Sequence, residues 1–353
     1  MKKVHLLIVF LLLFKFAMPQ SSVVDFIKAG KDDASTLFKS YLNPYALALG
    51  DGLNTGWYYS AESHKLMGFD FSLSFSAIKV PDADKTFDID ALGLTNLTVS
   101  GSNSIAPTVA GANSPGPSLE VHDDNGNTLA SFNSPGGVNL DVVPVPMAQL
   151  SFGLLPHTDI ILRYVPKLEF NNDDDKVKVG LFGIGAKHSF KEWLPFLKRL
   201  PFDAAVFAGY SKITAESGLT FGPTDYGANN NVSVTFTPGD DQRLEIETKT
   251  LKYGLIVSKK LGILTVFGAI GNSSSKSSID LLGKYPVVTA LSNGDLTITN
   301  EDALYDPINI DFDSSNVSLD AGLRLKLAFF SLFASVTKAE YTSFNAGLGL
   351  GFR

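Results

Sequence analysis

The chain has 353 residues, no cysteine and a formal net charge of −7 at pH 7, with 36 acidic against 29 basic side chains. Without cysteine it can form no disulfide, no thiolate metal site and no lipid-modified N-terminal cysteine. The excess of negative charge argues against nucleic-acid binding, because an acidic surface repels the phosphate backbone.

Residues 1–20 are predicted to be a secretory signal peptide. Lys2 and Lys3 precede an apolar run over residues 4–14, and small or polar residues follow. This three-part layout is typical of an export signal, and the run is too short to cross a bilayer as a helix. Removing residues 1–20 takes away three lysines and changes the formal charge from −7 to −10.

Residues 21–56 are predicted to form a helical segment that plugs or caps the rest of the chain. Ser22 can cap a helix in which apolar side chains recur at helical spacing. We expect Asn43-Pro44 to end this helix and the glycine-rich residues 50–56 to form a hinge. The apolar stripe that has to be buried, and hence the candidate plug surface, consists of Leu37, Phe38, Tyr41 and Leu42.

Residues 57–353 are dominated by alternation of apolar and polar side chains. Residues 67–77, 317–329 and 344–352 each place apolar side chains on one parity and small or polar ones on the other. Successive side chains of a strand point to opposite faces, so these segments are predicted to be strands with one apolar face. In residues 244–257 the apolar parity changes, which predicts a bulge near Thr250. Weaker strand patterns cover residues 86–99, 147–155, 158–170, 177–188 and 261–279.

Two architectures fit this alternation, a soluble β-sandwich and a transmembrane barrel. The long apolar rows, the final strand with Phe352 near its end and the long polar loops favour the barrel. After the first 20 residues no apolar run is long enough for a membrane helix. We therefore predict an all-β fold, an antiparallel transmembrane β-barrel of about 12–14 strands. Its long loops are expected at residues 101–146, 217–243 and 280–316, the first holding a hairpin around Asp124-Asn125-Gly126.

One segment interrupts the strand pattern. Ser189 and Glu192 have the spacing of a capping box, which predicts a short helix over residues 189–197. This helix would lie at the membrane interface or cap one end of the barrel.

The sequence gives little indication of catalysis. The four histidines beyond residue 20 have no second histidine at ligand spacing, and residues 50–56 lack the Gly-Lys-Ser/Thr ending of a phosphate loop. We predict no metal, no cofactor and no catalytic residues, so the chain is not expected to be an enzyme. A hydrolase on the barrel wall, with a histidine meeting an aspartate or serine, is the less favoured alternative. The histidines are His64, His122, His157 and His188.

The charged face of one strand suggests a lumen. Asp320, Arg324 and Lys326 share the parity opposite to the apolar row that includes Leu323, so they are the candidate lumen-lining residues. A plugged barrel of this kind suggests a passive channel or uptake protein, for which a small hydrophobic solute is favoured over sugars or ions. The alternative is a non-conducting structural or surface-binding barrel.

The chain resembles an uncharacterised family of secreted Bacteroidota proteins, a domain of unknown function treated as an outer-membrane barrel. The resemblance covers nearly the whole exported chain and implies no activity. It implies a location in the outer membrane of a Gram-negative bacterium, contact with outer-membrane lipid, and recognition of the last strand by the barrel-assembly machinery. More distantly, the helix before a barrel is similar to long-chain fatty-acid transporters, whose plug motif is loosely echoed by Asn43-Pro44-Tyr45. The motifs that carry the family resemblance are Asp32-Asp33-Ala34, Leu53 to Trp57, His64 to Asp70, Pro135-Gly136-Gly137, Thr158-Asp159 through Arg163-Tyr164, Lys187-His188 and Trp193-Leu194-Pro195.

Overall fold

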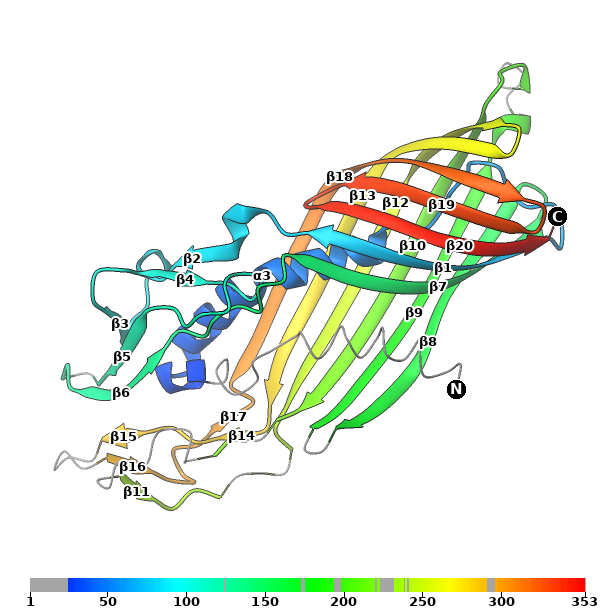
Figure 1. Cartoon of the computed structure of the whole chain (residues 1–353). Coiled ribbons are helices and arrows are strands. Elements are labelled where there is room, and N and C mark those ends of the chain that lie inside the picture. The colour runs from blue at the N-terminus through cyan, green and yellow to red at the C-terminus, as the bar shows by residue number, and fades with distance from the viewer. Residues whose placement is uncertain are drawn as a thin grey trace.

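Ten antiparallel strands close into a barrel, in the order β1-β20-β19-β18-β13-β12-β10-β9-β8-β7 (Figure 1). This computed structural model describes residues 25–352 apart from 124, 173–174, 194–197, 220, 223–231, 238, 240 and 291–295, so the predicted signal peptide lies outside the described residues. The strands are β1 (Phe69–Lys79), β7 (Val142–Leu155), β8 (Thr158–Asn172), β9 (Asp175–Ser189), β10 (Asp203–Gly218), β12 (Arg243–Leu261), β13 (Leu264–Leu282), β18 (Ile308–Leu327), β19 (Phe330–Lys338) and β20 (Thr342–Phe352).

The predicted barrel is confirmed, but its strand number is ten and not the expected 12–14. The difference comes from strand length. The strands β12, β13 and β18 have 19, 19 and 20 residues, about twice the 9–11 residues that a tilted strand needs to cross a bilayer. The extra residues in these long strands are the ones that would otherwise form additional strands.

The two ends of the barrel differ. At one end, here called the turn end, residues 156–157, 262–263 and 328–329 form tight connections, and both β1 and β20 have their outer termini there. One longer connection, over residues 190–202, also lies at this end. At the other end, the loop end, long connections over residues 80–141, 219–242 and 283–307 join the strands. These connections overlap the three predicted loops, although the first begins 21 residues earlier than expected.

An apolar band surrounds the half of the barrel nearest the turn end. Its width matches a membrane, because β1, β19 and β20 have only 11, 9 and 11 residues. On the outside, Phe71, Leu323 and Leu348 are 42%, 44% and 43% exposed, while Ser72 and Ser343 on the inside are buried. At the turn end Phe329 stacks on Phe352, with ring centroids 6.2 Å apart. Exposed apolar rows bounded by aromatic rings are typical of a transmembrane barrel.

The apolar face of the longest strands changes sides without a bulge. Register between β12 and β13 is continuous through Thr250, so the bulge predicted there is wrong. Leu255, within the membrane band, faces outward and is 50% exposed, whereas Leu244 near the loop end faces inward and is 9% exposed. Beyond the membrane band the strand continues into an aqueous region, and there its inner face is the apolar one.

The connection over residues 80–141 folds into a small unit, here called the loop module (Figure 1). A hairpin of β5 (Ser118–His122) and β6 (Thr128–Asn133) confirms the predicted one, and β3 (Leu97–Ser100) pairs with β5. The continuous strand expected over residues 86–99 is wrong: β2 (Thr86–Asp88) pairs with β4 (Ile105–Pro107), and the chain then turns through η3 (Asp90–Leu92). Short helix η2 (Asp82–Lys85) precedes β2.

The other two long connections carry short strands of their own. They are β11 (Val232–Val234), β14 (Lys284–Tyr285), β15 (Thr289–Ala290), β16 (Leu296–Ile298) and β17 (Leu304–Tyr305). Of these, β11, β16 and β15 form one small sheet and β14 pairs with β17.

The N-terminal segment begins at the loop end with η1 (Asp25–Ala29) and continues as helix α3 (Lys31–Asn54). The helix runs through Pro44, so the predicted helix end at Asn43-Pro44 and the predicted hinge over residues 50–56 are both wrong. Packing outweighs the loss of one helical hydrogen bond at a proline. On either side of Pro44, the Tyr41 and Tyr45 hydroxyls donate to the carbonyls of Gly136 and Leu140 in the loop module, at 2.8 and 2.9 Å.

The capping box predicted at Ser189 does not form. Ser189 is the last residue of β9, and its hydroxyl donates to the carbonyl of Ala204 at 3.3 Å. A single 3-10 turn, η4 (Lys191–Trp193), follows, and residues 194–197 lie outside the described residues. Among the described residues, no helix is long and apolar enough to cross a bilayer.

Candidate functional site: a lumen filled by the N-terminal segment

The second half of α3 enters the barrel from the loop end and packs against its wall (Figure 1). The whole helix contacts β1, β7, β10, β12, β13 and β18. Two glycines permit this close approach. A Cβ at Gly50 would lie 2.5 Å from the Ser275 Cβ, and one at Gly52 would lie 2.5 Å from the Val145 Cγ2. The glycine-rich sequence therefore serves helix packing, because any larger residue would collide with the wall.

Arg163 on β8 holds the end of the helix. Its guanidinium donates to the carbonyls of Leu53 and Thr55 at 2.6 and 2.9 Å, and its Nε donates to the Gln149 side chain at 2.9 Å. The last carbonyls of a helix lack partners within the helix and carry partial negative charge, so a cation there supplies both donors and charge. The guanidinium also stacks on the Trp57 ring, 3.7 Å from its centroid. Arg163 is fully buried.

Aromatic rings pack together inside the barrel, between the end of the helix and the turn end. Trp57 lies 5.5 Å from Phe207 between ring centroids, and Tyr58 lies 5.1 Å from the same ring. Tyr59 stacks on Phe333 at 3.5 Å. All five rings are at most 7% exposed.

Buried charges tie this aromatic layer to the wall. Asp320 on β18 accepts hydrogen bonds from Lys252 at 2.7 Å, from Thr337 at 2.6 Å and from the Tyr58 hydroxyl at 3.0 Å. Lys252 is 2% exposed. A buried carboxylate is tolerated only when it is paired and hydrogen-bonded, as it is here.

A second charged cluster holds the segment where it leaves the lumen at the turn end. Lys187 donates to the carbonyls of Ser60 and Glu62, at 3.1 and 2.8 Å. Its ammonium is also 3.1 Å from the carboxylate of Asp159. Asp159 accepts the backbone N–H of His64 at 2.8 Å, and its other oxygen is 3.1 Å from the His64 Nδ1. Hydrogen bonds and ion pairs with the barrel wall thus hold residues 51–64 at several points along the segment.

The predicted plug stripe is buried near the loop end of the barrel. Leu37, Phe38, Tyr41 and Leu42 are at most 2% exposed, in a core shared with the loop module and with the inner faces of β12, β13 and β18 near the loop end. Asp33 of the same helix accepts the backbone N–H groups of Thr95 and Asn96 at 2.8–3.1 Å. This half of the helix is the centre of the loop module's core.

The predicted lumen-lining residues lie on the inner face of β18. Asp320 is buried in the cluster described above. Arg324 donates to the carboxylate of Asp70 on β1 at 2.8 Å, and Lys326 is partly buried. Three further cations inside the barrel, Arg163, Lys187 and Lys252, are not among the predicted lumen-lining residues, although Arg163 and Lys187 belong to the motifs of the family resemblance. The signal in the sequence is a single cation in a strand, at a position whose parity is opposite to that of the outward-facing apolar side chains.

Among the described residues, one of the histidines meets a carboxylate on the barrel wall, as the hydrolase alternative requires. His64 contacts only Asp159 among the described carboxylates, and that carboxylate is shared with Lys187. His122 and His188 bond to the hydroxyls of Thr98 and Thr158, at 2.8 and 2.9 Å. No group of three or more potential metal ligands occurs within the described residues.

Comparison with known proteins identifies the family and adds remote structural likenesses. A model described as "Family of unknown function (DUF6588)" matches residues 1–352. No curated protein matches the chain. The outer-membrane protease OmpT from Escherichia coli is 9% identical with a TM-score of 0.32, covering 83% of this chain and 100% of that one. The translocator domain of the autotransporter NalP from Neisseria meningitidis is 9% identical with a TM-score of 0.32, covering 92% and 98%. The attachment invasion locus protein Ail of Yersinia pestis is 8% identical with a TM-score of 0.26, covering 82% and 100%. Likenesses this remote assign no function.

Proposed function

Since this chain belongs to DUF6588, a family of unknown function, its role has to be argued from its own geometry. We propose that it is a closed outer-membrane barrel that binds cationic partners at the cell surface through its loop module. The observation that carries this proposal is that one continuous segment both fills the lumen and forms the core of the loop module.

The filled lumen supports closure. Trp57, Tyr58 and Tyr59 are at most 7% exposed, and Arg163 and Lys187 fasten the chain on either side of them. A conducting pathway would require residues 51–61 to leave the barrel and would expose these cations without their partners. Uptake of a small hydrophobic solute would require the same departure of residues 51–61, so uptake stays a prediction.

The orientation follows from the unequal ends. Transmembrane barrels place short turns in the periplasm and long loops outside the cell. The loop end, with the loop module and the start of α3, is therefore the external face. This orientation, with the exposed apolar band and the predicted export signal, supports the outer membrane of a Gram-negative bacterium as the location.

Charge indicates the class of partner. Residues 80–141 contain eight acidic residues and one basic residue, Lys85, a formal charge of −7. Asp82, Asp88 and Asp90 are exposed on this module. A surface of one sign attracts partners of the opposite sign and raises their rate of association. The partner class that this module favours is a basic peptide or protein.

Binding of a basic probe tests the proposal. The mature barrel in nanodiscs should bind fluorescent deca-lysine but not deca-glutamate, with affinity falling as salt is raised. The triple variant Asp82→Asn, Asp90→Asn and Glu120→Gln should bind at least fivefold more weakly. A control with Glu62→Gln and Glu192→Gln, exposed at the turn end, should bind as the unmodified barrel does. Equal binding by both variants would refute the role of the loop module.

A further inference from the structure

The outer wall carries an aromatic belt at the loop-side edge of the apolar band. Tyr164, Phe182 and Tyr253 are 66%, 50% and 51% exposed, on β8, β9 and β12, and Tyr210 on β10 lies between them in the sheet. Aromatic girdles of transmembrane barrels lie where the hydrocarbon meets the headgroups. The outer-leaflet headgroups therefore begin at this belt.

Lysine is the first outward-facing charged residue beyond the apolar rows on five consecutive strands. These five residues, here called the lysine collar, are Lys167, Lys178, Lys212, Lys249 and Lys276. Register places Lys212 opposite Lys249, and Lys249 opposite Lys276. Like charges directly opposite one another on neighbouring strands are destabilising. Folding alone therefore does not explain this arrangement.

The carboxylates near the collar neutralise it only in part. Glu216 lies 3.5 and 3.4 Å from Lys167 and Lys178 and serves both. Glu247 is likewise shared, at 2.5 Å from each of Lys212 and Lys249. Four lysines thus share two carboxylates over β8 to β12. Glu169 lies opposite Lys178 in register, so one positive charge is left in excess.

The fifth lysine, on β13, has acidic neighbours on β18. Lys276 is 3.3 Å from the carboxylate of Asp311, and Asp313 lies opposite it in register. The positive excess of the collar is therefore over β8 to β12, and Lys276 marks its end.

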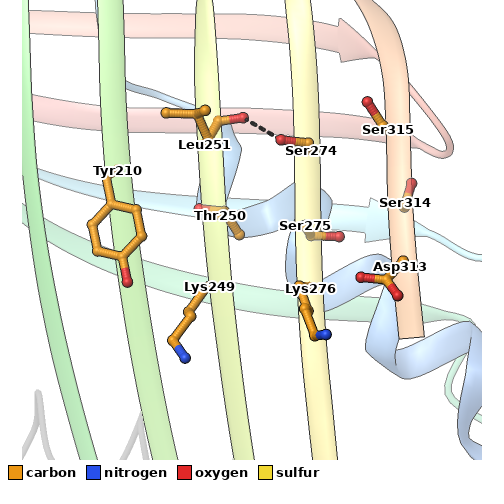
Figure 2. Close-up of a pocket in the computed structure, with 10 residues that line it drawn as sticks. All are labelled: Tyr210, Lys249, Thr250, Leu251, Ser274, Ser275, Lys276, Asp313, Ser314 and Ser315. Carbon is orange, nitrogen blue, oxygen red and sulfur yellow. Dashed lines mark hydrogen bonds between the residues drawn. The ribbon is translucent and has the colours of Figure 1, made fainter. Parts of the chain in front are cut away.

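A hollow of about 590 Å³ opens in the wall beside Lys249 and Lys276 (Figure 2). Figure 2 shows the two lysines and Asp313 in a line across three neighbouring strands, with Ser274 and Ser315 further along their strands beside Leu251. The Ser274 hydroxyl donates to the Leu251 carbonyl at 3.2 Å. Small hydroxyl side chains leave the space, and Tyr210 closes its far side.

We propose that the lysine collar and this hollow bind the phosphorylated sugar headgroup of an outer-leaflet glycolipid, whose acyl chains lie along the apolar band. Ammonium groups bind phosphate oxygens by charge-assisted hydrogen bonds, and serine and tyrosine hydroxyls suit a sugar. The apolar rows beneath the collar favour a lipid over a soluble phosphate, because only an amphiphile satisfies both surfaces. The inference rests on the outer-membrane location in the proposed function.

Lipid binding in detergent tests this proposal separately from conduction and from deca-lysine binding. The mature barrel is titrated with bisphosphorylated lipid A and with its dephosphorylated form, and bound lipid is counted by native mass spectrometry. The collar variant combines Lys212→Gln, Lys249→Gln and Lys276→Gln. The matched control combines Lys65→Gln, Lys259→Gln and Lys260→Gln, three exposed lysines at the turn end.

The expected result is at least tenfold tighter binding of the phosphorylated lipid, lost in the collar variant and kept in the control. One lysine near an anionic membrane surface is worth about a fivefold change in affinity. Equal binding of the two lipids, or equal losses in both variants, would overturn the proposal. Complete competition by millimolar inorganic phosphate would overturn the lipid as ligand. Binding abolished by EDTA but unchanged in the collar variant would assign the contact to carboxylates through a bridging cation.

Discussion

Arg163 is the residue whose removal should most clearly loosen the lumen segment. Its guanidinium donates to two carbonyls at the end of α3 and to Gln149, and it stacks on Trp57. Arg163→Met keeps much of the side-chain volume and removes every one of these interactions. We expect the barrel wall to persist while residues 51–61 lose their fixed position.

The magnitude follows from the acceptors left behind. Three buried oxygens would lack donors, each costing about 1–3 kcal/mol, and the stacked cation contributes up to about 2 kcal/mol. Removing the charge also relieves the cost of burying it, which offsets part of this loss. A net destabilisation of about 3–5 kcal/mol is therefore expected.

Tryptophan fluorescence provides the assay. The chain has only two tryptophans, so Trp193→Phe leaves Trp57 in the lumen as the single reporter. In that background Arg163→Met should shift Trp57 emission to the red and lower the urea midpoint. The control Arg243→Met removes an arginine that pairs with Glu245 on an exposed surface and should change neither.

An unchanged emission maximum together with a destabilisation below about 1 kcal/mol would refute the role assigned to Arg163. A variant that fails to insert into detergent micelles, shown by loss of the heat-dependent shift in gel mobility, would instead make Arg163 necessary for barrel assembly. Arg163→Lys, which keeps the charge but not the fork of donors, should lie between the two.

Four further outcomes are expected, each measured by reversible urea or thermal unfolding in detergent. Leu323→Arg should cost about 2–4 kcal/mol if its position is near the membrane centre, and Asp320→Ala should cost about 3–5 kcal/mol because it leaves Lys252 buried without its partner; tolerance of either change would contradict the described packing. Gly52→Ala should destabilise by about 1–3 kcal/mol through collision with the wall, and neutral behaviour would show that the helix is less closely packed. Lys79 and Lys85 lower the pKa of Asp141 at the base of the loop module from 3.8 to about 2. The stabilisation that ionised Asp141 provides is present above its ordinary pKa and is lost as pH falls from 3.8 to about 2. Asp141→Asn should therefore flatten the pH dependence of the unfolding free energy in that range. An unchanged pH profile would exclude Asp141 as the source of this pH dependence.

Local alternation predicts the barrel and the inner face of β18, but it misreads the long strands. In β12 the apolar side chains Leu244 and Leu255 have opposite parity because one faces the loop module and the other faces lipid. Sequence records only that the parity changes, and a bulge is the local explanation. The true cause lies in the solvent around each half of the strand, which depends on the assembled fold.

The lumen site depends on contacts that sequence spacing does not encode. Arg163 and the carbonyl of Leu53 are 110 residues apart, and Tyr58 and Asp320 are 262 apart. The glycines at 50 and 52 predict a hinge from local propensity, whereas their neighbours on the barrel wall require them within a helix. Tertiary packing thus outweighs the local preference.

The central claim is that residues 51–61 close the barrel, and conductance across a planar bilayer tests it most directly. The intact mature barrel should insert without stepwise conductance and should pass neither a sugar nor a hydrophobic probe in matched liposomes. Deletion of residues 31–61 in a barrel that keeps its heat-dependent gel shift should produce open steps. Stable steps or solute flux through the intact barrel would contradict closure and would favour a passive channel.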